Sequence, residues 1–264
     1  MPNHITNVIT INGVSKERTA EIIAAVKSDE EGVRHHSIDF NKLIPMPEEL
    51  KVESGSRSNQ ALKLYQEFLA ESQTLSMMNL TKSMPESEYS TAASELVKKY
   101  EKLSGNDSDL LSFGKQIYSN IQKYGSPDWY YWSIRNWGSK WNSYGYDDEP
   151  FHDEENQIEF LTAWSNVEPI MERLSQTFPD AEFFYQWADE DFGSNVGQQT
   201  WQNGEMIDEF IPENISAEAY ELAAEIVGIS LDEWGYQYSE EDETYHYVDP
   251  DMDESEEPGM GGLT

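Results

Sequence analysis

The sequence predicts an α+β protein, in which an antiparallel sheet is interrupted by a helical insertion and followed by an acidic C-terminal extension. Three observations predict this class. Apolar and polar residues alternate near the N-terminus and again in the second half of the chain, as in strands with one buried face. The segment between these regions has apolar residues at helical spacing and carries most of the lysines. Finally, residues 144–264 hold 33 Asp or Glu and a single basic residue, Arg173.

Residues 1–50 are predicted to form the first half of the sheet domain. His4–Ile11 alternates as a strand does and ends at Asn12-Gly13, a turn sequence. Ser15 is a suitable N-cap for a helix that reaches Val26. A short strand over Ser37–Phe40 follows, and the prolines at positions 45 and 47 then prevent both helix and central strand.

Residues 51–127 are predicted to be a helical insertion. Apolar residues recur at helical spacing in three segments, Ala61–Leu69, Glu88–Leu103 and Asp109–Tyr124. Each segment is long enough for at least two turns, so we expect three helices packed against the sheet.

Strand patterns return in residues 128–210, the expected second half of the sheet domain. The predicted strands are Trp129–Ser133, Gln157–Trp164, Ala181–Trp187 and Val196–Glu205, the last interrupted by Asn203-Gly204, and a helix over Val167–Phe178 separates the second from the third. Without the insertion, this order is close to the ferredoxin-like βαββαβ arrangement. Residues 211–264 are expected to add an acidic helix, Ser216–Val227, and a loosely held tail from Glu240.

Five blocks of the chain, in this order and spacing, resemble the YubB-type ferredoxin-like family of enterobacterial phages and conjugative plasmids. The resemblance implies a ferredoxin-like sheet and an origin on a mobile genetic element, but no activity and no catalytic residue. The chain has Ser139 where the family is expected to favour threonine, which keeps the hydroxyl. The blocks are Pro2–Asn7, Asp39–Pro47, Trp137–Asn142, Phe160–Trp164 and Ala188–Gly193.

Composition excludes several classes of protein. The absence of cysteine excludes disulfides, thiolate zinc sites and cysteine nucleophiles. The N-terminus lacks the pattern of a signal peptide, and no segment approaches 18 consecutive apolar residues. There is no glycine-rich phosphate loop and no nucleophile-elbow motif, and the five histidines lack metal-ligand spacing. We therefore expect a soluble, cytoplasmic protein that is not an enzyme, binds no cofactor and contacts no membrane.

The acidic half indicates the charge of a partner. The net charge of −34 divides into about −2 over residues 1–143 and about −32 over residues 144–264. Such a surface repels nucleic acid and anionic membranes and is attracted to basic clefts. Glu218, Glu221 and Glu225 form one stripe on the predicted helix, although like charges at this spacing destabilise an isolated helix.

We hypothesise that the carboxylates imitate the phosphates of a nucleic acid and occupy the basic DNA- or RNA-binding site of a host restriction, CRISPR or recombination protein. The alternative is that they serve solubility alone. Adaptation to high salt is disfavoured, since residues 1–143 are almost neutral. The candidate partner-binding residues are Asp147, Asp148, Glu149, Asp153, Glu154, Glu155, Asp189, Glu190, Asp191, Asp208, Glu209, Glu218, Glu221, Glu225, Asp232 and Glu233.

A second hypothesis is a module that binds a nucleotide or a single strand through Arg135, Trp137, Lys140 and Trp141. The indoles would stack on bases while Lys140 meets a phosphate. The alternative is that both tryptophans belong to the core. A third hypothesis is a metal-dependent hydrolase built on clustered carboxylates such as Asp189–Asp191. We favour the simpler interpretation of that cluster as solvated charge, and expect neither a metal site nor a catalytic residue.

Overall fold

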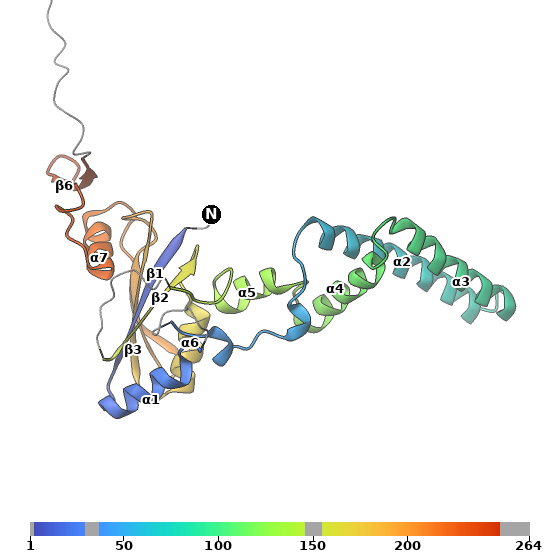
Figure 1. The fold of residues 1–264 in the computed structure, drawn as a ribbon, viewed down its shortest axis with the longest axis horizontal. Helices are drawn as coiled ribbons and strands as arrows, with labels where there is room; N and C mark the ends of the chain where they lie inside the picture. Colours follow the sequence, from blue (N-terminus) through green and yellow to red (C-terminus); the bar gives the residue numbers. More distant parts are fainter. Residues whose placement is uncertain (1–2, 30–36, 146–154, 249–264) are drawn as a thin grey trace, which may run out of the picture. The chain divides into compact units, whose positions relative to one another are not determined.

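The computed structural model describes residues 3–29, 37–145 and 155–248, and the chain divides into two compact units (Figure 1). The sheet unit comprises Met1–Leu43 and Asn142–Thr264, and the helical unit comprises Ile44–Trp141. The helical unit has 11 Lys or Arg and 12 Asp or Glu, which leaves 6 and 39 for the sheet unit. Nearly all of the net negative charge therefore belongs to one unit.

The sheet unit is built on a five-stranded sheet in which every neighbouring pair is antiparallel. The strand order is β2-β1-β3-β4-β5. The strands are β1 (His4–Asn12), β2 (Gln157–Ala163), β3 (Glu182–Asp189), β4 (Gly197–Gln202) and β5 (Glu205–Phe210).

Strand β1 lies between β2 and β3, so that Ile9 pairs with Ile158 on one side and with Tyr185 on the other. Helix α6 (Glu168–Thr177) connects β2 to β3 across β1, which is the split βαβ unit of a ferredoxin-like fold. Helices α1 (Lys16–Val26) and α6 cover one face of the sheet, and α7 (Ala217–Val227) covers the other (Figure 1). The predicted α+β class with a ferredoxin-like sheet is confirmed.

Alternation along β1 determines which side chains enter which core. Ile5, Ile9 and Ile11 are buried on one face of the strand, and Val8 is buried on the other. Val8 packs with Ala188 and Val196 of the sheet and with the apolar face of α7, namely Ala219, Leu222, Ala223 and Ile226. Burial of each large apolar side chain contributes about 1.5–3 kcal/mol, so α7 is part of the core and not an appendage.

The strand predicted over Ser37–Phe40 is wrong. Ile38 makes an isolated bridge to Lys27, and a 3-10 turn follows at once over Phe40–Lys42. The Asp39 carboxylate caps this turn by accepting from the backbone N–H of Asn41 at 3.0 Å, and the side chain of Asn142 supplies an acceptor for the N–H of Phe40 at 2.8 Å. Hydrogen bonds from side chains thus take the place of the backbone hydrogen bonds to a neighbouring strand that a strand would need.

The strand predicted over Trp129–Ser133 is also wrong, because Trp129–Trp137 is helix α5. Its aromatic residues have high strand propensity, but the ends of the segment carry helix signals. Asp128 accepts from the backbone N–H groups of Tyr130 and Tyr131, and Gly138 ends the helix at φ 81°. The helix belongs to the helical unit, although we expected residue 128 to begin the second half of the sheet domain.

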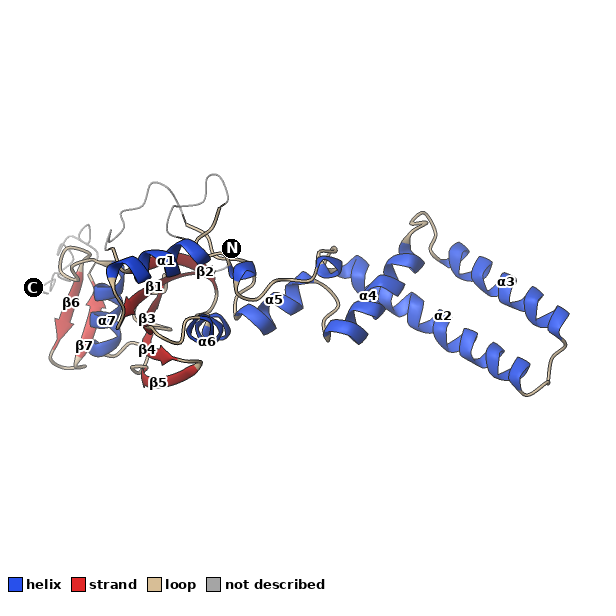
Figure 2. Ribbon diagram, turned by 90° about the horizontal axis from the view of Figure 1, so that it is seen from below, coloured by secondary structure: helices blue, strands red, loops and turns tan. Residues whose placement is uncertain are grey.

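Two hairpins differ from the predicted pattern. The single return strand Val196–Glu205 is instead two strands, β4 and β5, joined at Asn203 and Gly204 with φ of 51° and 82°, the positive values that a tight hairpin turn requires. A second hairpin, β6 (Tyr236–Ser239) and β7 (Thr244–Tyr247), packs beside α7 (Figure 2). Its second strand falls within the tail from Glu240 that was expected to be loosely held.

The helical unit contains α2 (Ser56–Leu80), α3 (Glu86–Leu103), α4 (Leu110–Tyr124) and α5. The three helices predicted within residues 51–127 are present, and α2 extends well beyond the predicted Ala61–Leu69. Helices α2 and α4 pack closely around Ala61, Leu110 and Ile117. No helix in the described part of the chain is long and apolar enough to cross a membrane.

Candidate partner-binding surface

The outer face of α7 carries a row of three carboxylates. Glu218, Glu221 and Glu225 are exposed, while the residues between them pack into the sheet unit. Ser216 caps the start of the helix by accepting from the N–H of Ala219, and Gly228 ends it at φ 75°. The carboxylates therefore share one face, as their spacing predicts. Only Glu221 has a side-chain hydrogen bond among the described residues, from the Tyr245 hydroxyl at 3.2 Å.

Strand β5 carries a second group of carboxylates at the edge of the sheet. All six residues of the strand are exposed, including Asp208 and Glu209. Glu209 accepts from the side-chain amide of Gln199 at 2.7 Å, whereas Asp208 points to the opposite face. Acidic residues on an edge strand also hinder pairing with another sheet edge, so solubility alone is one sufficient reason for their presence.

A hollow of about 490 Å³ lies between the start of α7 and the β6–β7 hairpin. Four carboxylates line it: Glu213, Glu218, Asp242 and Glu243. Asp232 and Glu233, which follow α7, are exposed as well. Exposed carboxylates thus continue from α7 over the C-terminal hairpin. We use the name acidic surface for the carboxylates of α7 and β5 together with Glu213, Asp232, Glu233, Asp242 and Glu243.

The carboxylates of α7 and β5 have no basic partner among the described residues. The ion pairs of the described sheet unit join other groups: Lys16 with Glu155, Arg18 with Glu21 and Asp180, and Lys42 with Asp29; the His246 ring contacts Asp242 at 2.9 Å. Lys16 donates to Glu155 at 2.6 Å and lowers the pKa of that carboxyl. Glu155 is therefore partly neutralised, whereas the charges of α7 and β5 face solvent uncompensated.

Asp189 was predicted as a surface contact, and the structure contradicts this. Its side chain is only 7% exposed. Its carboxylate accepts from the side chains of Asn3 and Asn195 and from the backbone N–H of Asp191, at 3.1, 3.0 and 2.9 Å. Asp189 thus holds the turn after β3 in place, a local bonding pattern typical of Asp. Its neighbours Glu190 and Asp191 are exposed.

Five further candidates lie outside the described residues. They are Asp147, Asp148, Glu149, Asp153 and Glu154.

The aromatic-basic patch divides into residues with different environments. Trp137 is 3% exposed, donates from its indole to the carbonyl of Ile44 at 2.9 Å and packs edge-on against Trp132, so it is a core residue. Arg135 lies over Gly125, the residue that ends α4. The prediction is therefore wrong for Trp137, whose indole is buried, while Arg135 is not among the residues that line the cavity of Lys140 and Trp141.

Lys140 and Trp141 do line an open cavity of about 540 Å³ in the helical unit. The Lys140 ammonium lies 4.4 Å from the centre of the Trp141 ring, a cation–π contact. The remaining lining residues come from the start of α2 and from α5: Ser54, Gly55, Asn59, Asp128, Trp129, Tyr130 and Tyr131. The sequence prediction placed these aromatic neighbours on a strand, whereas they lie on α5.

Exposed apolar residues accompany the acidic surface, and sequence reasoning missed them too. Met206, Ile207, Phe210 and Ile211 are each more than two-fifths exposed, in and just after β5. A register shift between Thr200 and Trp201 interrupts the pairing of β4 with β5 opposite this segment. The adjacent pair Met206-Ile207 is the sequence feature that indicates this exposure, because two successive apolar residues in a strand cannot both face one core.

Within the described residues, no three His, Asp or Glu side chains are arranged to hold a metal ion. The clustered carboxylates therefore lie too far apart, or point apart, in the part of the chain that the structure describes.

Part of the chain is similar to a known protein family. No curated protein matches the chain. Among solved structures, the protein api92 from Yersinia pseudotuberculosis is 14% identical over 81% of this chain and 99% of its own, with a TM-score of 0.33. Residues 137–251, which hold β2 to β7, α6 and α7, match the family model described as a ferredoxin-like domain in Api92-like protein.

Proposed function

We propose that this protein is a binding protein that imitates nucleic acid and occupies the basic DNA- or RNA-binding site of another protein. The observation that carries the proposal is the acidic surface: exposed carboxylates of α7 and β5 that have no basic partner among the described residues. They belong to a unit with 39 acidic and 6 basic residues. Long-range attraction to a basic cleft follows from that charge.

The spacing of the carboxylates supports the comparison with phosphates. Along α7, Glu218, Glu221 and Glu225 rise by about 4.5 and 6 Å, at about 1.5 Å per residue. Each strand of a DNA duplex carries one phosphate per about 3.4 Å of axis, which is the same order of charge density. The exposed Met206, Ile207 and Phe210 would add apolar contacts that a phosphate backbone lacks.

The partner class in this proposal is a host defence protein, of the restriction or CRISPR type, or a recombination protein. The protein would then be encoded by a mobile element, as the sequence resemblance implies, and would act in the cytoplasm of the host cell. No reaction is required, since the carboxylates act by occupying the lysines and arginines that would otherwise bind phosphate.

The test is a pull-down from lysate at low salt with the full chain as bait, eluted by salt and separately by duplex DNA. The bait is compared with the triple variant Glu218→Gln, Glu221→Gln, Glu225→Gln, which keeps the side-chain shape, replaces one oxygen of each carboxylate by an amide NH2 and removes three charges. We expect recovery of a basic nucleic-acid-binding protein that both eluents displace. If each carboxylate replaces one phosphate, the triple variant reduces the slope of log affinity against log salt by about 3.

A matched control removes three exposed charges from the helical unit: Glu48→Gln, Glu67→Gln and Glu101→Gln. This variant is expected to bind almost as the unmodified chain does, because its charges lie outside the acidic surface. Equal losses in the two triple variants, or an affinity unchanged between low and moderate salt, would contradict the proposal.

A second candidate function rests on the cavity beside Lys140 and Trp141. We propose it as the alternative: the cavity would take the base of a nucleotide or single strand against Trp141, with Lys140 meeting a phosphate. Titration with fluorescent mononucleotides and short single strands tests it. Trp141→Ala and Lys140→Ala should each weaken binding at least several-fold, whereas Trp234→Ala, an exposed indole of the sheet unit, should not. Binding that none of these changes affects would exclude the cavity.

A further inference from the structure

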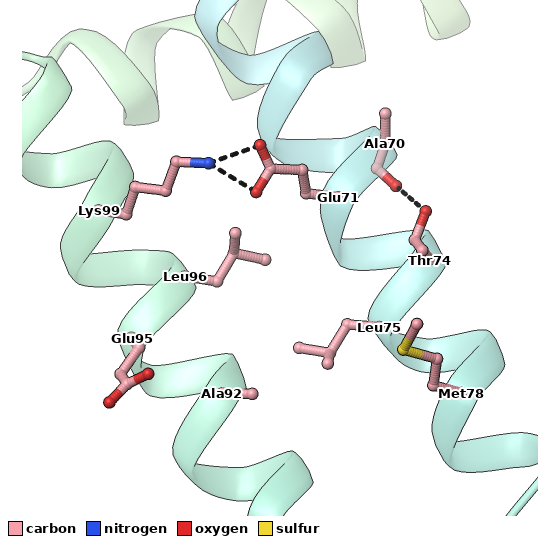
Figure 3. Close-up of a pocket in the computed structure, with 9 residues that line it drawn as sticks. All are labelled: Ala70, Glu71, Thr74, Leu75, Met78, Ala92, Glu95, Leu96 and Lys99. Atoms are coloured by element: carbon pink, nitrogen blue, oxygen red, sulfur yellow. Dashed lines mark hydrogen bonds and ion pairs between the residues drawn. The ribbon is translucent and has the colours of Figure 1, made fainter. Parts of the chain in front are cut away.

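Helices α2 and α3 contact each other along a seam that has the spacing of a coiled coil. On α2 the residues that face α3 are Phe68, Glu71, Leu75 and Met78, and on α3 they are Ala92, Leu96 and Lys99, so the steps alternate between three and four residues in both helices. Leu75 and Leu96 point toward each other between the helices (Figure 3).

An ion pair occupies one level of this seam. Lys99 donates to both oxygens of Glu71, at 2.6 and 2.8 Å (Figure 3). The Tyr100 hydroxyl donates to the same carboxylate at 2.8 Å. Polar groups at such positions fix the register of packed helices. The α2–α3 pair is therefore a built helical hairpin and not two independent helices.

The hairpin leaves an apolar groove uncovered. Leu75, Met78, Ala92 and Leu96 line an open groove of about 620 Å³. Of these, Met78 is 44% exposed. Helix α4 packs along α2, while α3 packs chiefly against α2. Two helices alone cannot bury an apolar stripe on each, whereas four can.

We propose that the same groove of a second copy of this chain covers this one, so that two α2–α3 hairpins form an antiparallel four-helix bundle. This interaction surface is independent of the acidic surface and of its proposed partner. A twofold interface of this kind uses the same patch on both copies, so each groove meets an identical one.

Charge is the first reason to assign a second copy as the occupant. Residues 56–103 are neutral in a protein of net charge −34. The sheet units of two copies repel each other, so self-association is favoured where the charges balance. The six cations of the hairpin are Arg57, Lys63, Lys82, Lys98, Lys99 and Lys102, and the six anions are Glu67, Glu71, Glu86, Glu88, Glu95 and Glu101.

The order of charges along α3 is the second reason. Glu86, Glu88 and Glu95 occupy its first part, and Lys98, Lys99 and Lys102 occupy its last part, where Glu101 is the one anion. Two α3 helices placed antiparallel bring the acidic end of one alongside the basic end of the other. A parallel arrangement would place like charges together, which is unfavourable. The pattern is thus complementary to itself under a twofold axis.

The first experiment measures the mass of the full chain in solution by sedimentation equilibrium over a range of concentrations. We expect association toward twice 30.4 kDa. Leu75→Glu with Leu96→Glu introduces charge into the groove and should leave a monomer. Ser94→Glu is the matched control, because Ser94 is exposed and about 160° from Leu96 around the helix, and it should dimerise as the unmodified chain does. Far-UV circular dichroism verifies that each variant keeps its helices.

The second experiment tests the antiparallel pairing and does not depend on the groove variants folding. One chain carries Glu86→Lys and Glu88→Lys, and the other carries Lys98→Glu and Lys102→Glu, all at exposed positions. Each chain alone should associate at least tenfold more weakly than the unmodified protein, and an equal mixture should regain association as a heterodimer. A chain that stays monomeric at every concentration overturns the proposal, as does a mixture that associates no better than its components.

Discussion

At the scale of single residues, a buried polar network holds the centre of the sheet. Asn7 is fully buried, and its amide donates to Thr162 at 2.9 Å and to the carbonyl of Ile5 at 2.8 Å. The Tyr185 hydroxyl donates to Asn7 at 2.6 Å and accepts from the N–H of Val167 at 3.0 Å, directly before α6. The network connects β1, β2 and β3 to the start of the crossover helix, so every member depends on the others.

Tyr185→Phe should therefore destabilise the sheet unit. The substitution leaves the N–H of Val167 without its acceptor and the side-chain oxygen of Asn7 without its donor, and each buried unsatisfied group costs about 1–3 kcal/mol. Urea unfolding followed by tryptophan fluorescence measures the loss, since Trp187 packs on Tyr185. Tyr247→Phe, at a 61% exposed position, is the control and should change the free energy of unfolding by less than about 0.5 kcal/mol.

A second residue-scale prediction concerns alkaline pH. Burial and the hydrogen bond to Glu71 raise the pKa of Tyr100 from its ordinary value of 10.0 to about 12. The folded state therefore retains the phenol proton at a pH where the unfolded chain loses it. Stability from this group is complete below pH 10 and is lost as the pH rises toward about 12.

Tyr100→Phe removes the ionisable group and should flatten this part of the pH profile. Helical content followed by circular dichroism between pH 10 and 12 measures the difference between the two chains. Identical profiles would mean that the Tyr100 proton is not linked to the folding of the α2–α3 hairpin.

At the scale of elements, α4 approaches α2 at backbone contact through one glycine. A Cβ on Gly114 would lie 2.0 Å from the carbonyl oxygen of Ala61 and 2.8 Å from the Cβ of Tyr65. Both atoms are fixed to the α2 backbone, so neither can move aside without shifting the helix. Glycine is thus required by packing, although it lowers helix propensity.

Gly114→Ala should destabilise the helical unit, even though alanine normally stabilises a helix interior by about 0.5–1 kcal/mol. Overpacking of this kind costs about 1–3 kcal/mol or more, so the sign of the change is reversed. Thermal unfolding followed by circular dichroism checks it. Ser119→Ala on the exposed side of the same helix is the control and should leave stability unchanged or slightly raised.

The elements also show where pattern reasoning works. The strand from His4, the helix after Ser15 and the helix after Ser216 were predicted because alternation, caps and helical spacing agree at those places. Helix α5 is the exception, because the strand propensity of its aromatic residues and the helix caps at its ends disagree. The C-terminal hairpin was not predicted, because its acidic composition is typical of a solvated tail. Four contacts between tyrosine rings hold it against α7 and hold its strands together: Tyr220 with Tyr236 and with Tyr245, Tyr236 with Tyr247, and Tyr238 with Tyr245.

At the scale of the whole molecule, the boundary between the two units also separates the nearly neutral part of the chain from the acidic part. The helical unit is nearly neutral, with 11 basic and 12 acidic residues, and the sheet unit holds the remaining 6 and 39. Repulsion among the carboxylates of the sheet unit opposes its folding, and salt screens it over a Debye length of about 10 Å at 0.1 M.

Added salt should therefore protect the two units differently. Hydrogen exchange followed by mass spectrometry reports each unit separately, because peptides from residues 44–141 come from the helical unit alone. Between low and moderate salt, exchange in α7 and β5 should slow severalfold, while exchange in α2 and α4 should change little. Equal slowing in both units would show that the effect is general and not a consequence of the acidic surface.

The sequence by itself determined the α+β class, the strands and helices with consistent local signals, and the stripe of carboxylates on α7, because these depend on residue spacing within one element. Only the tertiary structure decided which candidates share a surface. It placed Asp189 and Trp137 inside, and it brought Lys140 and Trp141 together at one cavity. It also revealed the apolar groove between α2 and α3. The physical reason is that burial is decided by contacts between residues far apart in the chain, which no local spacing records.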